Sequence, residues 1–394
     1  MPLLRPADGL PAVVADRAAL VRAARDVATG IGPLAVDAER ASGFRYSQRA
    51  YLVQLRREGA GTALVDPIPL GSDLSELAPA LTGPEWVLHA ANQDLPCLAE
   101  VGLAPSRLFD TELAGRLAGL PRVGLGPLVA QLLGLALEKG HSAADWSRRP
   151  LPEDWLVYAA LDVEVLVELR DVLAGLLAEQ GKLEWAEQEF EAIRTAGPST
   201  PRAEPWRRTS GIHKIRKPRQ LAAVRALWEA RDRLAAERDI APGRVLPDAA
   251  IIDAVVTAPT SASAMAAMPV FRGRSQRRLT TYWFAALQEA AGLTTAELPL
   301  VSPVNDGPPP VARWAERNPD AAARLTAARA AVAGVAEQWS VPVENLLQPD
   351  LLRRLCWDPP ADGDVAAALP TGGARPWQTT LLTPHLEAAL HARN

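Results

Sequence analysis

The sequence predicts an α/β domain, a mixed sheet with covering helices, followed by two all-α modules. Three observations support this prediction. Apolar runs of strand type alternate with segments of helical period through the first 200 residues. The composition then changes at residues 196–201, which read Ala-Gly-Pro-Ser-Thr-Pro. The rest of the chain shows helical patterns, interrupted by a Pro-rich stretch at 302–310.

These changes divide the chain into five segments. We expect the α/β domain at 1–200, a basic linker at 201–217, a helical module at 218–295, a Pro-rich linker at 296–310 and a second helical module at 311–394. From the start of the basic linker to the first residues of the helical module, seven Arg and Lys residues stand against one acid. This stretch is therefore a candidate basic surface.

The composition is that of an ordinary globular protein, with 48% hydrophobic and 22% charged residues. A net charge of −4 offers no general attraction to nucleic acid, so such a role would need local basic patches. Cys97 and Cys356 lie far apart without metal-ligand spacing, which fits a reducing compartment. Because we find no signal-peptide core and no apolar run near the roughly 18 residues of a membrane span, we expect a cytoplasmic protein.

The α/β domain is predicted to begin with a helix and three strands. Apolar residues at helical spacing predict the helix over 16–29. Strand-type runs follow at 33–37, 50–56 and 62–66, and the Glu-Gly-Ala-Gly turn at 58–61 predicts a hairpin between the last two. The sheet should therefore start with antiparallel strands.

Helices become more frequent further along the domain. A helix over 73–81 and a strand over 86–89 precede a helix that begins near Leu95. Pro96 suits the first turn of that helix, because its missing N–H is not needed there. Residues 111–180 show mostly helical patterns with two interruptions, and these helices are expected to cover the sheet.

The two helical modules resemble each other in sequence. The Ala-Glu pair at 236–237 recurs at 336–337, and Pro242 recurs as Pro342, an offset of 100 residues. The apolar segments that follow match with one extra residue. We therefore expect one small unit used twice: a helix, a short loop with a central proline, and a second apolar helix.

The most informative stretch is Leu-Ala-Val-Asp-Ala-Glu at 34–39. An apolar strand ends here in Asp37 and Glu39, whose spacing points both side chains to the same face. Acids are depleted in strands, and burying two like charges is costly unless a cation lies between them. The pair therefore predicts a metal site, with ordinary strand-end acids as the alternative.

Two further acidic positions extend this prediction. Asp94 follows a second strand, although an acid near a helix N-terminus is also stabilised by the helix dipole. Tyr158 and Asp162 share one helix face, although such a pair is also ordinary on an amphipathic helix. Together with Asp37 and Glu39, these acids predict a site for two divalent cations, Mg²⁺ or Mn²⁺, of the kind that hydrolyses phosphodiesters.

The order of these motifs resembles the DEDD exonuclease superfamily, in its tyrosine subclass: Asp-x-Glu on a strand, Asp after a later strand, and Tyr-x-x-x-Asp on a helix. Segments 218–292 and 311–390 look like HRDC modules, the second one diverged. Over residues 10–185 the chain is similar to the ribonuclease D family through Val53-Gln-Leu55, Phe109-Asp-Thr111, Lys139, Asp145-Trp-Ser-Arg-Arg149 and Tyr158-Ala-Ala-Leu-Asp162.

The resemblance implies an RNase H-like exonuclease fold that acts on the 3′ end of structured RNA, such as a tRNA precursor, and releases nucleoside 5′-monophosphates. It implies that the four acids are metal ligands and that Tyr158 orients the attacking water. In one departure, the superfamily often has Asn four residues before the second-motif Asp, where this chain has Ala90. Asn92 is therefore not that residue.

Further residues are expected to contact nucleic acid. Arg40 follows the acidic pair and is a candidate phosphate ligand, and Asp110 matches a family position with a supporting role. The family positions at Lys139, Trp146 and Arg149 are candidates for substrate contact. A basic surface is expected from Arg207, Arg208, Lys214, Arg216, Lys217, Arg272, Arg274, Arg277 and Arg278. The alternative is a solvated linker and loop without a partner.

Two other functions stay open. A 3′→5′ exonuclease acting on DNA would use the same sheet and metals, because only contacts to the 2′-OH distinguish RNA from DNA. A non-catalytic adaptor would bind nucleic acid through the helical modules alone, but it would have no reason to keep four acids together. The sequence indicates neither a protein partner nor a membrane partner.

Overall fold

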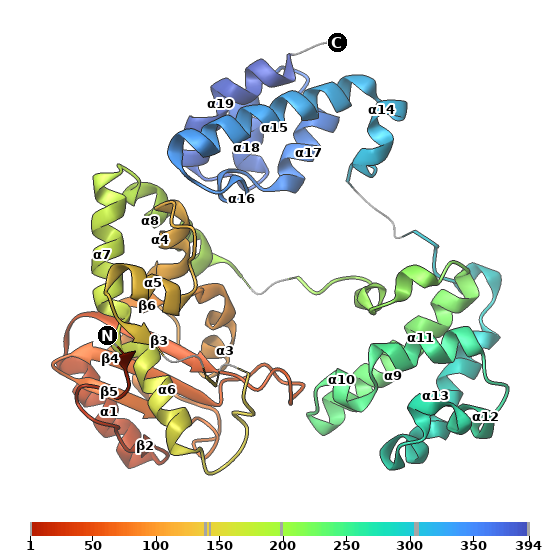
Figure 1. Cartoon of the computed structure of the whole chain (residues 1–394), viewed down its shortest axis with the longest axis horizontal. Coiled ribbons are helices and arrows are strands. Elements are labelled where there is room, and N and C mark those ends of the chain that lie inside the picture. The colour runs from red at the N-terminus through yellow and green to blue at the C-terminus, as the bar shows by residue number, and fades with distance from the viewer. Residues whose placement is uncertain (1, 138–139, 142, 198–199, 303–306, 392–394) are drawn as a thin grey trace.

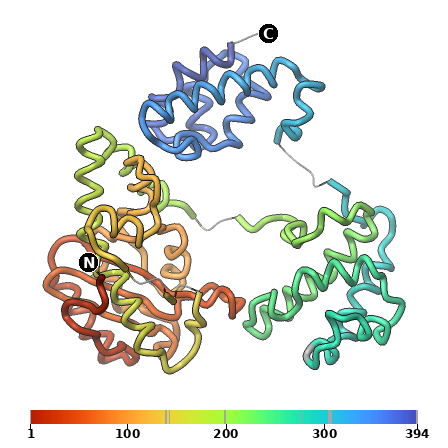
Figure 2. The backbone as a smooth tube through the Cα atoms, in the orientation of Figure 1, coloured from red at the N-terminus to blue at the C-terminus, as the bar shows by residue number. Residues whose placement is uncertain are grey.

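The computed structural model describes residues 2–137, 140–141, 143–197, 200–302 and 307–391. It has three lobes, which Figure 1 shows in red to yellow-green, in green to teal and in blue. The first lobe contains the sheets, and every element described in the second and third lobes is a helix. Figure 2 follows the chain from the first lobe through the second to the third.

A mixed six-stranded sheet forms the centre of the first lobe. In spatial order its strands are β2 (Val13–Val14), β5 (Gly61–Val65), β4 (Leu52–Glu58), β3 (Ile31–Glu39), β6 (Glu85–Leu88) and β7 (Arg107–Asp110). β3 pairs antiparallel with β4 and parallel with β6, and β4 pairs antiparallel with β5. The β4–β5 hairpin turns at Gly59 and Gly61, whose φ angles of 79° and 75° favour glycine. The predicted mixed sheet is thus confirmed.

Helices cover this sheet. They are α1 (Arg17–Thr29), α2 (Ala78–Leu81), α3 (Leu95–Glu100), α4 (Thr111–Leu117), α5 (Leu125–Leu132), α6 (Glu153–Glu164), α7 (Leu166–Glu179) and α8 (Leu183–Thr195), with 3₁₀ helices η1 (Ser75–Leu77) and η2 (Ala91–Gln93). β1 (Pro2–Leu3) and β8 (Ala136–Leu137) pair in parallel and form a separate two-stranded sheet. The predicted helix over 16–29 corresponds to α1, and four helices fill most of the predicted helical stretch at 111–180.

β3 separates the hydrophobic core from the acidic face of the sheet. Leu34 and Val36 are fully buried in the core together with Leu20 of α1. Because side chains alternate along a strand, Asp37 and Glu39 point to the opposite face. α6 lies on that face and contacts β3, β4 and β5. The sheet and α6 therefore enclose the two acids from both sides.

The second lobe begins earlier than predicted. Its helices are η3 (Pro205–Arg208), η4 (Ile212–Lys214), α9 (Pro218–Arg238), α10 (Pro242–Val245), α11 (Asp248–Thr257), α12 (Ala262–Ala267), η5 (Pro269–Phe271), α13 (Arg274–Gly292) and η6 (Thr295–Glu297). Trp206 and Ile215 are buried in the core of this lobe. The interpretation of 201–217 as a linker is therefore wrong for its larger part, because these two apolar side chains anchor it. The predicted linker at 296–310 lies partly outside the described residues.

The third lobe repeats the helix order of the second. Its helices are η7 (Val311–Arg313), α14 (Trp314–Arg317), α15 (Pro319–Trp339), α16 (Val343–Leu346), α17 (Pro349–Trp357), α18 (Val365–Thr371) and α19 (Pro376–Leu390). α9 and α15 have the same length and end in left-handed caps, Asp239 and Ser340. The structural offset is thus 101 residues, and the predicted offset of 100 is wrong, because short Ala-Glu matches recur by chance in Ala-rich helices.

The third lobe packs directly on the first. The Trp185 ring of α8 stacks on Trp377 at a centroid distance of 4.7 Å and meets the edge of Trp339 at 4.9 Å. The buried Lys182 ammonium donates hydrogen bonds to the carbonyls of Leu117, at 2.8 Å, and of Trp339, at 2.6 Å. Side chains of both lobes therefore belong to one continuous hydrophobic core. In the part of the chain described, no helix is both long and apolar enough to cross a membrane.

Candidate active site

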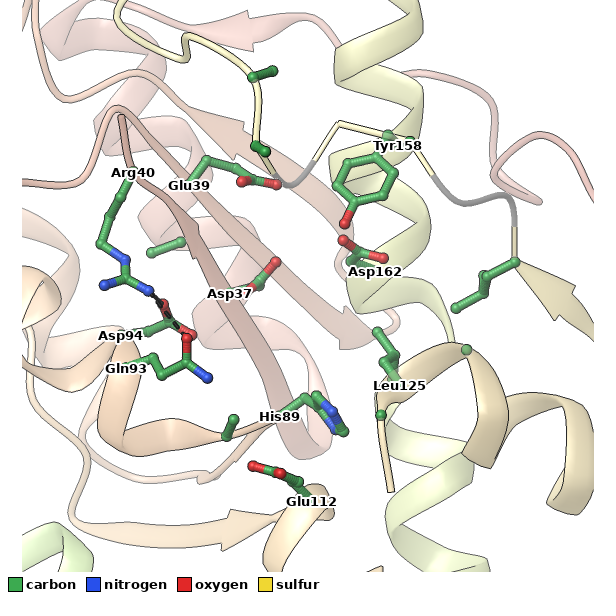
Figure 3. Close-up of a pocket in the computed structure, with 18 of the residues that line it drawn as sticks. Asp37, Glu39, Arg40, His89, Gln93, Asp94, Glu112, Leu125, Tyr158 and Asp162 are labelled. Atoms are coloured by element: carbon green, nitrogen blue, oxygen red, sulfur yellow. Dashed lines mark hydrogen bonds and ion pairs between the residues drawn. The ribbon is translucent and has the colours of Figure 1, made fainter. Parts of the chain in front are cut away.

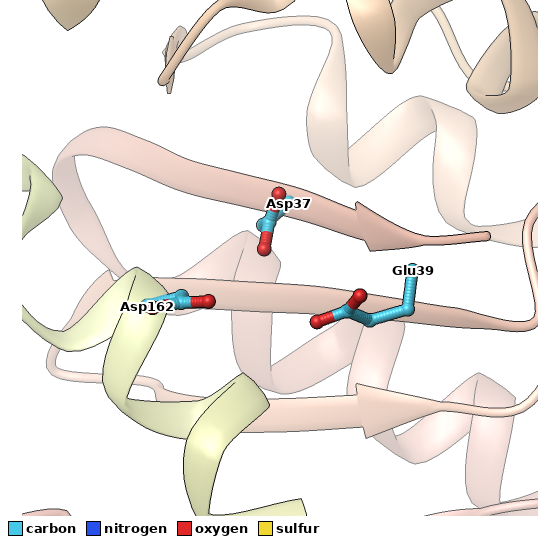
Figure 4. A group of neighbouring side chains, drawn as sticks. All are labelled: Asp37, Glu39 and Asp162. Carbon is cyan, nitrogen blue, oxygen red and sulfur yellow. The ribbon is translucent and has the colours of Figure 1, made fainter. Parts of the chain in front are cut away.

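The five residues that the sequence singles out surround one pocket. It has a volume of about 940 Å³ and is lined by Asp37, Glu39, Asp94, Tyr158 and Asp162 (Figure 3). Carboxylate oxygens of three of these acids, on β3 and α6, lie within 4.8 Å of one another (Figure 4). The pocket therefore concentrates negative charge at the C-terminal end of β3.

Three separate elements deliver the acids. Asp37 and Glu39 share a face of β3 because they are two residues apart. Asp162 lies on α6, which crosses that face, one helical turn after Tyr158. Asp94 occupies the N-cap position of the short helix α3, which follows the neighbouring strand β6. The site thus forms only when the sheet, α3 and α6 are all in place.

Burial and mutual repulsion make these carboxylates hard to ionise. Loss of hydration is the largest cause in each case, and it raises the pKa of Asp37 to about 6 and the pKa of Asp94 and Asp162 to about 8. The pKa of Glu39 is also raised well above its usual value, first by burial and then by the charges of the other three acids. Divalent cations would offset this repulsion, so hard oxygen ligands and an excess of negative charge fit such ions.

The Tyr158 hydroxyl group points toward the Asp162 carboxylate (Figure 3). Burial, followed by the negative charges of Asp162 and Glu39, raises the pKa of the phenol above its ordinary value. The hydroxyl group therefore keeps its proton at neutral pH. It can position a polar molecule in the pocket, but it does not act there as a preformed base.

The Asp110 carboxylate holds the turn that leads to Asp94. It accepts hydrogen bonds from the backbone N–H groups of Ala90, at 3.0 Å, and of Ala91, at 2.9 Å, and it also caps the first turn of α4. Ala90 has a left-handed backbone with φ of +59°, a conformation that Asn tolerates better than Ala. Asn92 is exposed and does not line the pocket. Asp110 therefore has a supporting role in this structure.

Comparisons with known proteins bear on this arrangement. Residues 12–178 match the family model described as 3′-5′ exonuclease, and residues 220–287 match the HRDC domain. The chain is 33% identical to ribonuclease D of Gluconacetobacter diazotrophicus, over 70% of this chain and 71% of that protein. It is 31% identical to ribonuclease D of Granulibacter bethesdensis, over 77% of this chain and 75% of that protein.

The chain belongs to the ribonuclease D family. It is accordingly a 3′→5′ exonuclease with a nucleic-acid substrate, and the DEDD exonucleases of this kind use divalent metals. This confirms the predicted family and reaction class. Its acidic cluster supplies the ligand chemistry for such ions.

Solved structures confirm the fold of this ribonuclease D family member. A crystal structure of a protein from Bifidobacterium adolescentis superimposes with a TM-score of 0.92 at 40% identity, covering 99% of both chains. Escherichia coli RNase D superimposes with a TM-score of 0.68 at 24% identity, over 96% of this chain and 98% of that one. Residues 307–390 match a model described as 3′ to 5′ exonuclease C-terminal domain, which is separate from the HRDC model that the sequence resemblance suggested.

Two predicted nucleic-acid contacts are wrong. The Trp146 ring is fully buried, and its indole N–H donates to the His141 carbonyl at 3.1 Å. All five N–H groups of the Arg149 guanidinium are used, in a two-bonded pair with Asp66 at 2.6 and 2.7 Å and in bonds to three main-chain carbonyls. Both side chains therefore have a structural role where the segment before α6 meets the sheet. Lys139 lies outside the described residues.

Arg40 lies at the edge of the pocket. Its guanidinium lies 3.7 Å from Asp94 and donates to the Gln93 side chain at 3.4 Å (Figure 3). It therefore compensates part of the Asp94 charge, and its contact with phosphate stays a prediction. Gln93 and Glu112 also line the pocket, and sequence reasoning missed both because no pattern distinguishes them from surface residues.

The predicted basic residues lie on the second lobe. One of them, Arg207, makes its contacts within that lobe. Arg207 pairs with Glu204 at 2.6 Å and lies 4.3 Å from the centre of the Trp206 ring, so it stabilises the lobe, and its contact with nucleic acid stays a prediction. The lobe, taken as 205–300, carries 15 Arg and Lys residues against eight acids. The exposed candidates are Arg208, Lys214, Arg216, Lys217, Arg272, Arg274, Arg277 and Arg278.

The raised carboxyl pKa values predict how stability depends on pH. Because the folded-state pKa values of Asp37, Asp94 and Asp162 exceed those of the unfolded chain, their contribution to stability is present below about pH 4. It is lost as the pH rises through about 6 and about 8. In EDTA we expect the Tm to fall between about pH 5 and about pH 8, and Mg²⁺ to restore it.

A matched pair of variants sharpens this measurement. Asp162→Asn removes one repelling charge, so it should raise the Tm in EDTA at about pH 8 and weaken the response to Mg²⁺. Asp253→Asn changes an exposed acid of the second lobe and should leave both unchanged. A lower Tm for Asp162→Asn than for the wild type under these conditions would contradict the electrostatic account.

Proposed function

We propose that this chain is a two-metal 3′→5′ exoribonuclease that trims structured RNA, such as tRNA precursors, and releases nucleoside 5′-monophosphates. The observation that carries this proposal is the group of four acids around one pocket, two of them buried, with the Tyr158 hydroxyl group beside Asp162. The RNA preference rests on the ribonuclease D relatives. The free, buried thiols of Cys97 and Cys356 are in keeping with a reducing cytoplasm.

The four acids would divide two cations between them. One, Mg²⁺ or Mn²⁺, would be held by Asp37, Glu39 and Asp162, and the other by Asp37 and, directly or through water, Asp94. When bound, the two ions supply a water activated for attack and charge stabilisation for the leaving 3′ oxygen. Asp37 is central because it serves both ions.

Other side chains orient the reactants. Tyr158 keeps its proton and its hydroxyl group lies beside Asp162, so it can fix the attacking water without removing a proton from it. Arg40 lies beside Asp94 at the pocket edge, where its guanidinium can contact the phosphate of the RNA chain. The proton that the attacking water loses would then pass to the solvent or to one of the acids.

The charge distribution favours an RNA-binding role for the second lobe. Residues 1–204 carry 28 acids against 19 Arg and Lys residues, so the catalytic lobe repels a polyanion outside its pocket. The second lobe has the opposite balance, and its exposed basic residues gather in segments 208–217 and 272–278. Affinity for a long RNA therefore depends on that lobe.

The proposal is tested by digesting 3′-tailed RNA and DNA of equal sequence with Mg²⁺, Mn²⁺ or EDTA. RNA should yield 5′-monophosphates with either metal and nothing in EDTA. Asp37→Ala, Glu39→Ala, Asp94→Ala and Asp162→Ala should each reduce digestion to background, whereas Asp26→Ala, an exposed acid of α1, should not. Wild-type digestion by Asp37→Ala and Asp162→Ala would refute the site, and faster digestion of DNA would favour a DNA exonuclease.

The role of Tyr158 has its own test. Tyr158→Phe removes the hydroxyl group but keeps the ring, so turnover should fall by about 10²-fold or more while the affinity for RNA hardly changes. Single-turnover rates and binding titrations measure the two quantities separately. Normal turnover with weaker binding would make Tyr158 a packing or stacking residue.

The contribution of the second lobe is measured by salt dependence. Each phosphate that a basic residue neutralises adds roughly 0.7 to the slope of log affinity against log salt on single-stranded RNA. The full chain with Arg274→Ala and Arg277→Ala should bind long RNA more weakly and with a flatter slope than the wild type, while a short strand is still trimmed. Equal slopes for the two proteins would show that the basic segment 272–278 does not hold RNA.

A further inference from the structure

The second lobe docks on the loop that follows the catalytic strand. This loop, residues 40–51, joins β3 to β4, and its residues Ser42 and Gly43 line the catalytic pocket. Asp239, the left-handed cap of α9, accepts a hydrogen bond from the Ser47 N–H at 2.9 Å and pairs with Arg49 at 3.1 Å. The loop is thus held by an acid of another lobe.

A second set of contacts joins α10 and the residue before it to Gly43 and Phe44 of this loop. The Arg244 guanidinium donates to the Gly43 carbonyl at 2.7 Å and lies 4.0 Å from the centre of the Phe44 ring. The Ala241 N–H donates to the Phe44 carbonyl at 3.0 Å. A residue that lines the pocket is therefore in direct contact with the second lobe.

The same helix touches the basic segment 272–278. The Gln276 side chain, in the first turn of α13, donates to the Val245 carbonyl at 2.6 Å, next to Arg244. On either side of Gln276 the segment exposes Arg272, Arg274, Arg277 and Arg278. A short series of contacts, from Gly43 through α10 to Gln276, thus joins the pocket to a group of four exposed arginines.

We propose that this docking fixes the span between the RNA body, bound by the basic segment, and the 3′ end in the pocket, and so sets the shortest tail that is trimmed. The proposal rests on the proposed function, because it needs the basic segment to bind RNA. Two sites held at a fixed span bind one RNA together only while its tail reaches from one to the other. When trimming has shortened the tail below that span, the advantage of the joint binding is lost and trimming slows.

The ion pair across the interface allows a charge exchange. Asp239→Lys places two cations together and Arg49→Glu places two anions together, so each single variant should loosen the docking. The double variant restores an opposite pair. Asp239→Asn keeps a residue that tolerates the left-handed backbone but removes the charge, so it should give a smaller effect. Asp253→Lys, on an exposed site of α11, is the matched control.

The substrates are an RNA hairpin with a long 3′ tail and a short single strand that cannot reach the second lobe. For the two single variants the KM of the hairpin should rise by about 10-fold or more and the final tail lengths should become shorter and more varied. Turnover of the short strand should stay within about twofold of wild type, because the pocket acids are unchanged. The double variant should return both the KM and the final length toward wild type.

Two outcomes would contradict the proposal. Sharp, wild-type final lengths in both single variants would overturn the proposal, as would a loss that the double variant does not restore, which would mark a merely structural effect. If a single variant fails to fold, Tyr46→Phe, which removes the bond to Asp232 at 3.2 Å, provides a milder test with the same readouts. Failure of the proposed RNA-binding role would instead appear as an unchanged salt slope in Arg274→Ala with Arg277→Ala.

Discussion

Repulsion among four carboxylates crowded around one pocket is the constraint on which the rest of the structure depends. The acids come from three elements and lose hydration when these meet, which raises their pKa values. The surroundings must therefore hold them together at a cost in stability. A strand whose Leu34 and Val36 are fully buried in the core carries two of them. Asp110 fixes the turn before the third, and Arg40 offsets part of its charge.

The three lobes divide the remaining tasks according to their charge and packing. The third lobe extends the core of the first through stacked tryptophans and the buried Lys182, so its contacts stabilise the catalytic lobe. The second lobe touches the first through one loop, by polar contacts and by the packing of Tyr46, and it carries the positive charge. This difference agrees with the separate family models that the two modules match. The two modules thus share a helix order but differ in their contacts and in their charge.

The sequence predicted the parts of this structure that depend on local patterns. Strand period, the Gly-containing hairpin turn and helical period located β3, β4, β5 and α1 to within a few residues. The two-residue strand β2 and the four-residue strand β7 are too short to show a period, and they were missed. Asp37 and Glu39 were found because acids in an apolar strand contradict their local context. That contradiction is itself the signal of a site.

The errors concern residues whose environment is set by distant parts of the chain. Arg149 finds its partner Asp66 83 positions away, and nothing near either residue indicates the pairing. Trp206 and Ile215 turn an apparent linker into part of a folded lobe, because two apolar side chains outweigh the charges around them. Exposure and partner choice follow from tertiary structure, and a basic or aromatic residue type alone predicts neither.

The central claim is that the buried acids form a site for two cations that share Asp37. Calorimetric titration of Mn²⁺ into chelator-treated protein measures it most directly, because it counts ions without relying on activity. The account predicts two bound ions in the wild type and one in Asp94→Asn. In Asp37→Asn both sites should be weakened together. A single ion in the wild type, or two ions bound with wild-type affinity by Asp37→Asn, would contradict it.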